Sequence, residues 1–81
     1  MKTLLVIKDD CLNSLMAVNW AKREIKEFEI VDIDKTPDVA MLYGVVDFPT
    51  LLKIDQHGLV NSVSGYNADL YNKLMEDGII D

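Results

Sequence analysis

The chain has 81 residues, a formal net charge of −6 and 49% hydrophobic residues, with one cysteine and one histidine. The length and the apolar fraction predict a single domain over residues 1–81 that folds around its own apolar core. A single cysteine excludes a disulfide within the chain, so this core has to stabilise the fold without one. The acidic balance argues against nucleic acid and anionic membrane as partners, and no apolar run approaches the ~20 residues of a membrane span.

The first two predicted elements place the cysteine between a strand and a helix. Residues 4–7 are continuously apolar, as in a buried strand. From residue 12 onward, helical spacing is followed by Leu12, Leu15, Met16, Val18, Trp20 and Ala21. Cys11 therefore falls at a helix N-terminus, where free N–H groups and the helix dipole stabilise a thiolate. Ser14 lies on the same side of that turn, so its hydroxyl is placed to donate to the sulfur. The alternative is a plain buried cysteine.

The next segment predicts a second strand and a short helix. Residues 28–34 alternate apolar and acidic side chains, which is typical of a strand with one wetter face. Thr36-Pro37-Asp38 is a helix start, with Thr36 as the capping hydroxyl. Gly44 supplies the left-handed end of that helix.

The last third of the chain predicts a hairpin and a final helix. Residues 49–55 and 59–63 read as strands joined by a turn that contains His57, which we expect to be solvated. Asn67 caps a helix that Gly78 ends. The order β-α-β-α-β-β-α predicts an α/β domain, and a right-handed crossover makes its first two strands parallel.

Short motifs then point to a family. Asp34-Lys35-Thr36-Pro37, Tyr43-Gly44-Val45 and Phe48-Pro49-Thr50-Leu51 match the thioredoxin pattern D-x-x-P, Y-G-(I/V), (I/V)-P-T-L without gaps. Lys8, three residues before Cys11, and the turn from Ser64 to Asp69 are similar to glutaredoxins and to the glutaredoxin-like donors of ribonucleotide reductase. The chain therefore resembles small thioredoxin-fold proteins of the glutaredoxin and redoxin type over essentially its whole length.

The resemblance implies a four-stranded mixed sheet flanked by three helices, with a cis Phe48–Pro49 bond facing the thiol. It makes Cys11 the nucleophile, with Ser14 beside it. It implies that the substrate is bound by Lys8, Phe48, Pro49, Gly65, Tyr66 and Asp69. Lys8 would anchor a glutathione carboxylate and Asp69 would pair with its amine. An exposed strand-end lysine and a first-turn acid that complements the helix dipole are the alternatives for these two residues.

The chain departs from the family at its motif. Cys-x-x-Cys is replaced by Cys11-Leu12-Asn13-Ser14, so the thiol that would resolve a mixed disulfide is absent. Monothiol chemistry remains: Cys11 attacks a disulfide or a glutathionylated cysteine, and an external thiol such as glutathione releases the adduct. A natural Cys-x-x-Ser protein and an engineered trap with the resolving cysteine replaced both fit. Because Asp9 and Asp10 disfavour a thiolate, we expect only a modestly lowered Cys11 pKa. Leu5 replaces the family's buried acid.

Two functions follow as expectations. The first is a thiol–disulfide oxidoreductase that donates electrons to protein disulfides or glutathionylated proteins, such as ribonucleotide reductase, and is itself reduced by a thioredoxin or glutathione system. The second is a redox-inert thioredoxin-fold module that binds a partner through the face around Cys11, Phe48 and Gly65. We expect a cytoplasmic monomer with no signal peptide, no metal and no cofactor beyond glutathione as co-substrate. Asp32 and Asp34 form an acidic pair without further ligands in the sequence.

Overall fold

The computed structural model describes residues 2–80, with side chains as far as residue 76. The elements occur in the predicted order, which confirms the α/β class. They are β1 (Lys2–Ile7), α1 (Leu12–Glu24), β2 (Glu29–Asp32), α2 (Asp38–Tyr43), β3 (Thr50–Asp55), β4 (Gly58–Ser64) and α3 (Ala68–Ile80). Among residues 2–80, every helix is too short or too polar to cross a membrane.

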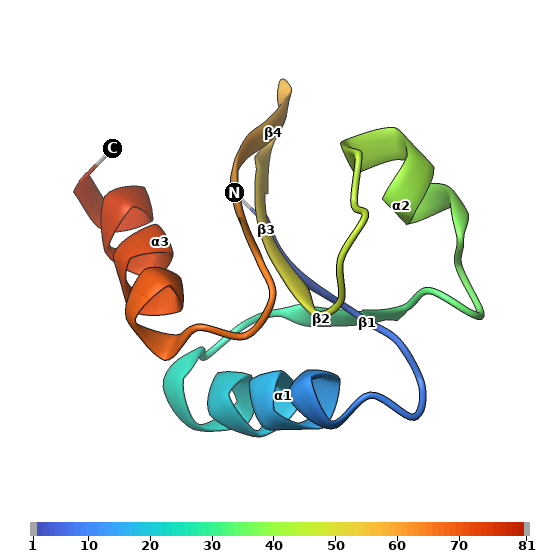
Figure 1. Ribbon diagram of the computed structural model, residues 1–81. Helices are drawn as coiled ribbons and strands as arrows, with labels where there is room; N and C mark the ends of the chain where they lie inside the picture. The colour runs from blue at the N-terminus through green and yellow to red at the C-terminus, as the bar shows by residue number, and fades with distance from the viewer. Residues whose placement is uncertain (1, 81) are drawn as a thin grey trace.

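The four strands form one mixed sheet in the order β2-β1-β3-β4 (Figure 1). β1 pairs with β2 in parallel and with β3 antiparallel, and β3 pairs antiparallel with β4. The predicted parallel crossover and the predicted hairpin are therefore both present. Val6 pairs with Thr50, so the end of β1 lies beside the start of β3. This pairing brings the segment after β1 and the segment before β3 to the same edge of the sheet.

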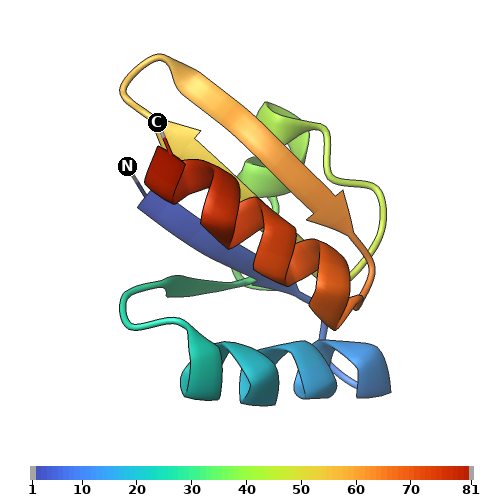
Figure 2. The same ribbon diagram turned by 90° about the vertical axis from the view of Figure 1, so that its left-hand side faces the viewer.

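Helices cover both faces of the sheet, with α3 in front of it and α2 behind it in the view of Figure 2. One core packs β1 and β3 against α1 and α3, and it is built from Leu5, Ala17, Trp20, Ala21, Ile25, Leu51, Tyr71 and Leu74. Trp20 and Tyr71 meet edge to face at 5.2 Å between ring centroids, and both belong to this core. The second core, on the α2 side, comprises Leu4, Val6, Leu52 and Ile54 with partly buried neighbours.

The buried face of α1 differs from the one that the apolar spacing marks. Leu12 and Leu15 are 72% and 57% exposed, and Met16 is exposed as well. The buried positions are instead Ser14, Ala17, Trp20 and Ala21. Ser14, Ala17 and Ala21 follow the i, i+3, i+7 spacing of one helix face, and their small side chains let the helix lie close to the sheet. The large apolar residues of the first two turns are consequently left at the surface.

Thr36 does not supply the predicted cap of α2. The helix begins at Asp38 after Pro37, and among the described side chains none caps it. The Thr36 N–H donates to the Asp32 carbonyl at 2.9 Å, so Thr36 belongs to the preceding turn. Gly44 has a φ of 67°, which confirms the predicted left-handed end of this helix.

At α3 the predicted start is correct and the predicted end is wrong. Asn67 Oδ1 accepts the Leu70 N–H at 3.1 Å. The helix then continues through Gly78 to Ile80. Glycine permits a left-handed helix end but does not require one. The buried Lys53 of β3 donates to the carbonyls of Leu74 at 2.8 Å and Met75 at 3.3 Å. These two hydrogen bonds satisfy the buried ammonium group, which would otherwise lie without partners between β3 and α3.

Candidate active site

Cys11 lies where the chain turns from β1 into α1. It is the N-cap residue, with extended backbone angles (φ −111°, ψ 115°), and its carbonyl accepts the Leu15 N–H at 3.1 Å. The turn needs a left-handed residue at Asp10, with φ 61°, a conformation that aspartate tolerates better than most side chains. The half-buried thiol therefore lies at the positive end of a helix of 13 residues.

Ser14 connects the end of β1 to the first turn of α1. Its side chain is 2% exposed, and its Oγ accepts the Lys8 N–H at 3.2 Å. Hydrogen bonding from the Ser14 hydroxyl, followed by its backbone N–H, lowers the pKa of Cys11 against the opposing effect of burial. The expected direction is confirmed. The backbone N–H of Asn13 and the charge of Lys8 lower the pKa of Cys11 further.

The predicted cis bond between Phe48 and Pro49 is present and faces the thiol. Cys11 Sγ lies 4.0 Å from the Phe48 carbonyl oxygen. Pro49 is fully buried, and its carbonyl accepts the Gly65 N–H at 2.7 Å. The Thr50 hydroxyl donates to the Asp47 carbonyl at 2.6 Å. These bonds tie the loop to the turn before α3 and fix its own shape, while the Phe48 carbonyl lies next to the start of α1.

The turn before α3 reaches the site only in part. Gly65, with φ 77°, contacts Pro49, and its carbonyl accepts the Tyr71 hydroxyl at 2.5 Å. Burial raises the pKa of Tyr71, so this hydroxyl stays a donor. The half-buried Tyr66 packs edge to face on Tyr71 at 5.7 Å. Asp69 is exposed in the first turn of α3, and no described contact joins it to Cys11. Its pairing with a glutathione amine stays a prediction.

A groove of about 440 Å³ opens beside the sulfur. We call it the Cys11 groove. Its polar side is formed by Lys8, Asp9, Asp10, Cys11 and Ser14, and its apolar side by Ile7, Leu12, Leu15, Val18 and Ile30. The exposed leucines of α1 thus form one wall of the candidate site.

Three carboxylates meet at the same edge of the sheet. Oxygens of Asp9, Asp32 and Asp34, which we call the acidic cluster, lie within 4.8 Å of one another. Repulsion from Asp32 is the main cause that raises the pKa of Asp9. The sequence indicated the Asp32–Asp34 pair but not its third member. Asp9 could have been found from the parallel pairing of β1 with β2, because the segments that follow two neighbouring parallel strands lie side by side.

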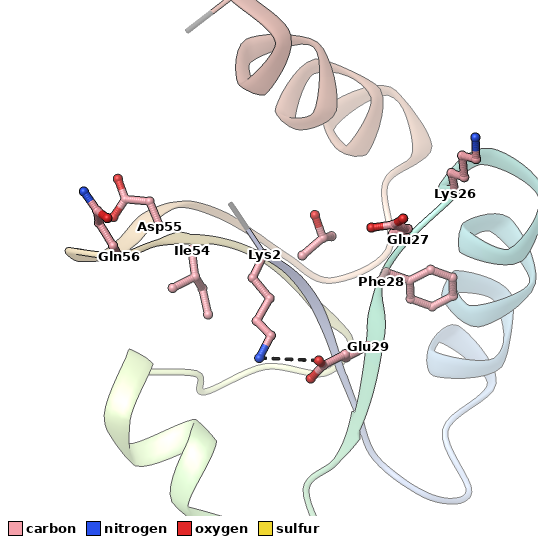
Figure 3. A pocket seen from close by; sticks show the side chains of 9 residues that line it. Lys2, Lys26, Glu27, Phe28, Glu29, Ile54, Asp55 and Gln56 are labelled. Carbon is pink, nitrogen blue, oxygen red and sulfur yellow. Dashed lines mark ion pairs between the residues drawn. The ribbon is translucent and has the colours of Figure 1, made fainter.

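A larger pocket, of about 760 Å³, lies at the opposite end of β1 (Figure 3). Lys2 and Glu29 form an ion pair at 3.4 Å there, and Lys26, Glu27 and Phe28 complete one side. Among the described residues that line it, none carries a thiol or an imidazole. His57 is exposed in the hairpin turn, as expected, at the end of β3 remote from Pro49. The reactive groups are therefore concentrated around Cys11.

Comparison with known proteins agrees with this fold. No protein-family model matches the chain. The SPbeta prophage-derived thioredoxin-like protein YosR of Bacillus subtilis (strain 168) is 28% identical over 78 residues, which cover 95% of this chain and 98% of that protein. The thioredoxin of Plasmodium falciparum aligns with a TM-score of 0.85 at 17% identity, covering 94% of this chain and 83% of its own. The fold is thioredoxin-like.

A glutaredoxin aligns on the same thioredoxin-like fold. The glutaredoxin of Archaeoglobus fulgidus matches with a TM-score of 0.71 at 24% identity, covering 91% of this chain and 85% of its own. The likeness to a thioredoxin-like relative suggests a redox function, and the two solved structures, each below 25% identity, support the fold alone. The chemistry of that function depends on what surrounds Cys11.

Proposed function

We propose that the protein carries out thiol–disulfide exchange with partner proteins, with Cys11 acting as the only nucleophile in a monothiol cycle. One observation carries most of the weight: a half-buried thiol with a lowered pKa lies at a helix N-terminus, 4.0 Å from the carbonyl of the cis Phe48–Pro49 bond. A purely structural cysteine needs neither the hydrogen bonds from Ser14 nor an open groove beside its sulfur.

The first step is attack by the Cys11 thiolate on one sulfur of a partner disulfide. A bond forms between Cys11 Sγ and that sulfur, the partner's S–S bond breaks, and the second partner sulfur leaves as a thiolate that takes a proton from solvent. Cys11 is thereby oxidised and the leaving sulfur reduced. The Ser14 hydroxyl and the N–H groups of the first turn stabilise the attacking thiolate.

The second step needs a thiol from outside, because the chain has no other cysteine. An external thiolate attacks the Cys11 sulfur, which releases the reduced partner and leaves Cys11 bound to the small thiol. A second external thiol then attacks that small-thiol sulfur, which yields a small disulfide and regenerates the Cys11 thiolate. Glutathione is the external thiol that the resemblance implies, with Lys8 and Asp69 as its contacts. Ribonucleotide reductase is one partner of the required kind.

Phe48, Pro49 and Gly65 would position the partner in this scheme. The Phe48 carbonyl is a backbone acceptor next to the nucleophile, and bonds to Gly65 and within the Asp47–Thr50 turn fix its orientation. An extended partner segment can pair with such an edge through its own backbone N–H groups. Its reacting sulfur would then lie over Cys11.

Ser14→Cys tests this mechanism directly. Because positions 11 and 14 share one side of the first helical turn, two cysteines there suit the Cα separation of about 4.4–6.8 Å that a disulfide needs. We expect this chain to accumulate a mixed disulfide between Cys11 and one chain of oxidised insulin when no small thiol is present. With dithiothreitol as reductant, Ser14→Cys should reduce insulin faster than this chain does, because its second thiol releases the insulin chain from within. Cys11→Ala and the double variant Cys11→Ala with Ser14→Cys are the matched controls, and both should be inactive.

The contrary result is equally specific. If Ser14→Cys gains no turnover and forms no disulfide between positions 11 and 14, Cys11 is not the nucleophile of a thioredoxin-like site. If Cys11 also alkylates no faster than a free cysteine at neutral pH, the redox-inert binding module becomes the better account.

A further inference from the structure

The surface beside the nucleophile is apolar although it faces solvent. Leu12 and Leu15 of α1 are exposed, and the exposed Ile30 of β2 lines the same groove. None of these side chains belongs to the core cluster, to which α1 contributes Ala17, Trp20 and Ala21 and to which Ile25 is added just after the helix. An open apolar wall next to a reactive sulfur favours a partner with an apolar side chain near its own reacting cysteine.

Negative charge also lines the groove. Asp9 and Asp10 line it, and Asp9 is one member of the acidic cluster with Asp32 and Asp34. The raised pKa of Asp9 reflects how closely these carboxylates are held together. Among the described residues that line the groove, Lys8 is the one cation. The groove therefore joins an apolar wall to a net negative rim.

We infer that the Cys11 groove selects protein disulfides whose reacting cysteine is flanked by a basic and an apolar side chain, and that it disfavours anionic disulfides such as that of glutathione. This substrate class deepens the proposed function and rests on it. The basic side chain would lie near the acidic cluster, and the apolar one against Leu12, Leu15 and Ile30.

Charge complementarity is what commits the groove to this occupant. Glutathione disulfide carries four carboxylates and two ammonium groups, a net charge of about −2 at neutral pH, so the rim repels this oxidised substrate more strongly than the singly charged reduced glutathione that would release the adduct. A segment with lysine or arginine beside its cysteine is attracted instead. Fields of this kind change association rates by roughly 10- to 1,000-fold, and they are screened as salt is added.

The test compares the rates at which Cys11 of the intact protein reacts with disulfides of three short, capped peptides. In the first the cysteine is flanked by leucine and lysine, in the second by leucine and glutamate, and in the third by glycine and lysine; glutathione disulfide is the fourth probe. In each reaction Cys11 Sγ bonds to one peptide sulfur, and the other peptide leaves as a thiol that can be counted. The leucine–lysine peptide, called the lysine peptide below, should react at least about tenfold faster in about 10 mM salt than the leucine–glutamate peptide, called the glutamate peptide. The ratio of these two rates should collapse in about 1 M salt.

Variants assign the selectivity to the acidic cluster. Asp9→Asn combined with Asp34→Asn should reduce the lysine-to-glutamate rate ratio several-fold, and Asp32 is left in place because its carboxylate accepts the Asp34 N–H at 2.9 Å. Glu27→Gln, which removes one charge at the opposite end of β1, should leave the ratio unchanged. A ratio is the right readout, because a changed Cys11 pKa alters the rates with all four probes alike. Leucine over glycine should gain about three- to tenfold from partial burial.

The possible outcomes distinguish a failure of the proposed selectivity from a failure of the proposed thiol–disulfide exchange. Equal rates with the lysine and glutamate peptides, or a ratio that the two asparagine substitutions do not change, would overturn the selectivity while leaving thiol–disulfide exchange intact. Faster reaction with glutathione disulfide than with the lysine peptide would also overturn it. Failure of every disulfide to react would instead refute the proposed function.

Discussion

Ser14→Ala removes the hydroxyl that joins the end of β1 to the first turn of α1, next to the Cys11 thiol. Two losses are expected together, because the same oxygen accepts the Lys8 N–H at 3.2 Å and its hydroxyl is the main cause of the lowered pKa of Cys11. A residue that served only to fill space would produce neither loss.

The cost in stability follows from the Lys8 N–H. A buried donor left without its acceptor costs about 1–3 kcal/mol, and this bond is only partly buried, so that water can replace part of it. We therefore expect Ser14→Ala to lower the free energy of unfolding by about 1 kcal/mol. In a domain of this size that corresponds to a fall in Tm of about 4–8 °C. The pKa of Cys11 should rise at the same time.

Urea unfolding at fixed pH measures the first effect, and the pH dependence of iodoacetamide alkylation measures the second. Asn13→Ala is the matched control, because it truncates a neighbouring exposed side chain in the same turn and leaves both Ser14 interactions in place. An unchanged alkylation profile in Ser14→Ala would refute the assignment of the thiolate's stabilisation to this hydroxyl. An unchanged free energy of unfolding would refute its role in joining the strand to the helix.

Three further predictions use the same kind of measurement. The pKa of Cys11 in the folded protein lies below its unfolded value of about 8.5. The thiolate therefore adds its full contribution to the free energy of unfolding above about pH 8.5, and this contribution is lost as the pH falls through the folded-state pKa. Cys11→Ala should abolish this pH dependence in urea titrations. Asp9→Asn should raise Tm at pH 7, and the gain should shrink toward pH 3.8, because a raised carboxyl pKa stabilises the fold only while the group is protonated. Tyr71→Phe should cost about 1–2 kcal/mol by leaving the Gly65 carbonyl without its donor, whereas Tyr66→Phe, at a half-buried ring, should cost less than half as much.

The fold was largely predictable because local signals agreed with one another. The apolar run of β1, the left-handed Gly44 and the Asn67 cap each marked a boundary near its observed place. The proline at position 49 together with the family resemblance predicted the cis bond. Such signals lie within a few residues of one another and do not depend on how the elements pack.

What could not be predicted depends on packing between distant segments. The apolar spacing of α1 identified a helix, but which side faces the sheet was decided by small residues such as Ala17 and Ala21. Lys53 reads as an outward strand residue until α3 supplies carbonyls for its ammonium group. The acidic cluster required the register of β1 on β2.

The strand order β2-β1-β3-β4 divides the site between the centre and the margin of the sheet. Cys11 and Pro49 follow and precede the two central strands, which are held by neighbours on both sides. Asp32 and Asp34 belong to the short edge strand β2 and the turn after it, and edge elements open at lower free energy than central ones. The segments that carry Cys11 and Pro49 are therefore anchored to central strands, whereas part of the acidic cluster is anchored to the edge strand β2. If the proposed selectivity holds, substitutions in β2 should change which disulfides react fastest while the contact between Cys11 and Phe48 is kept.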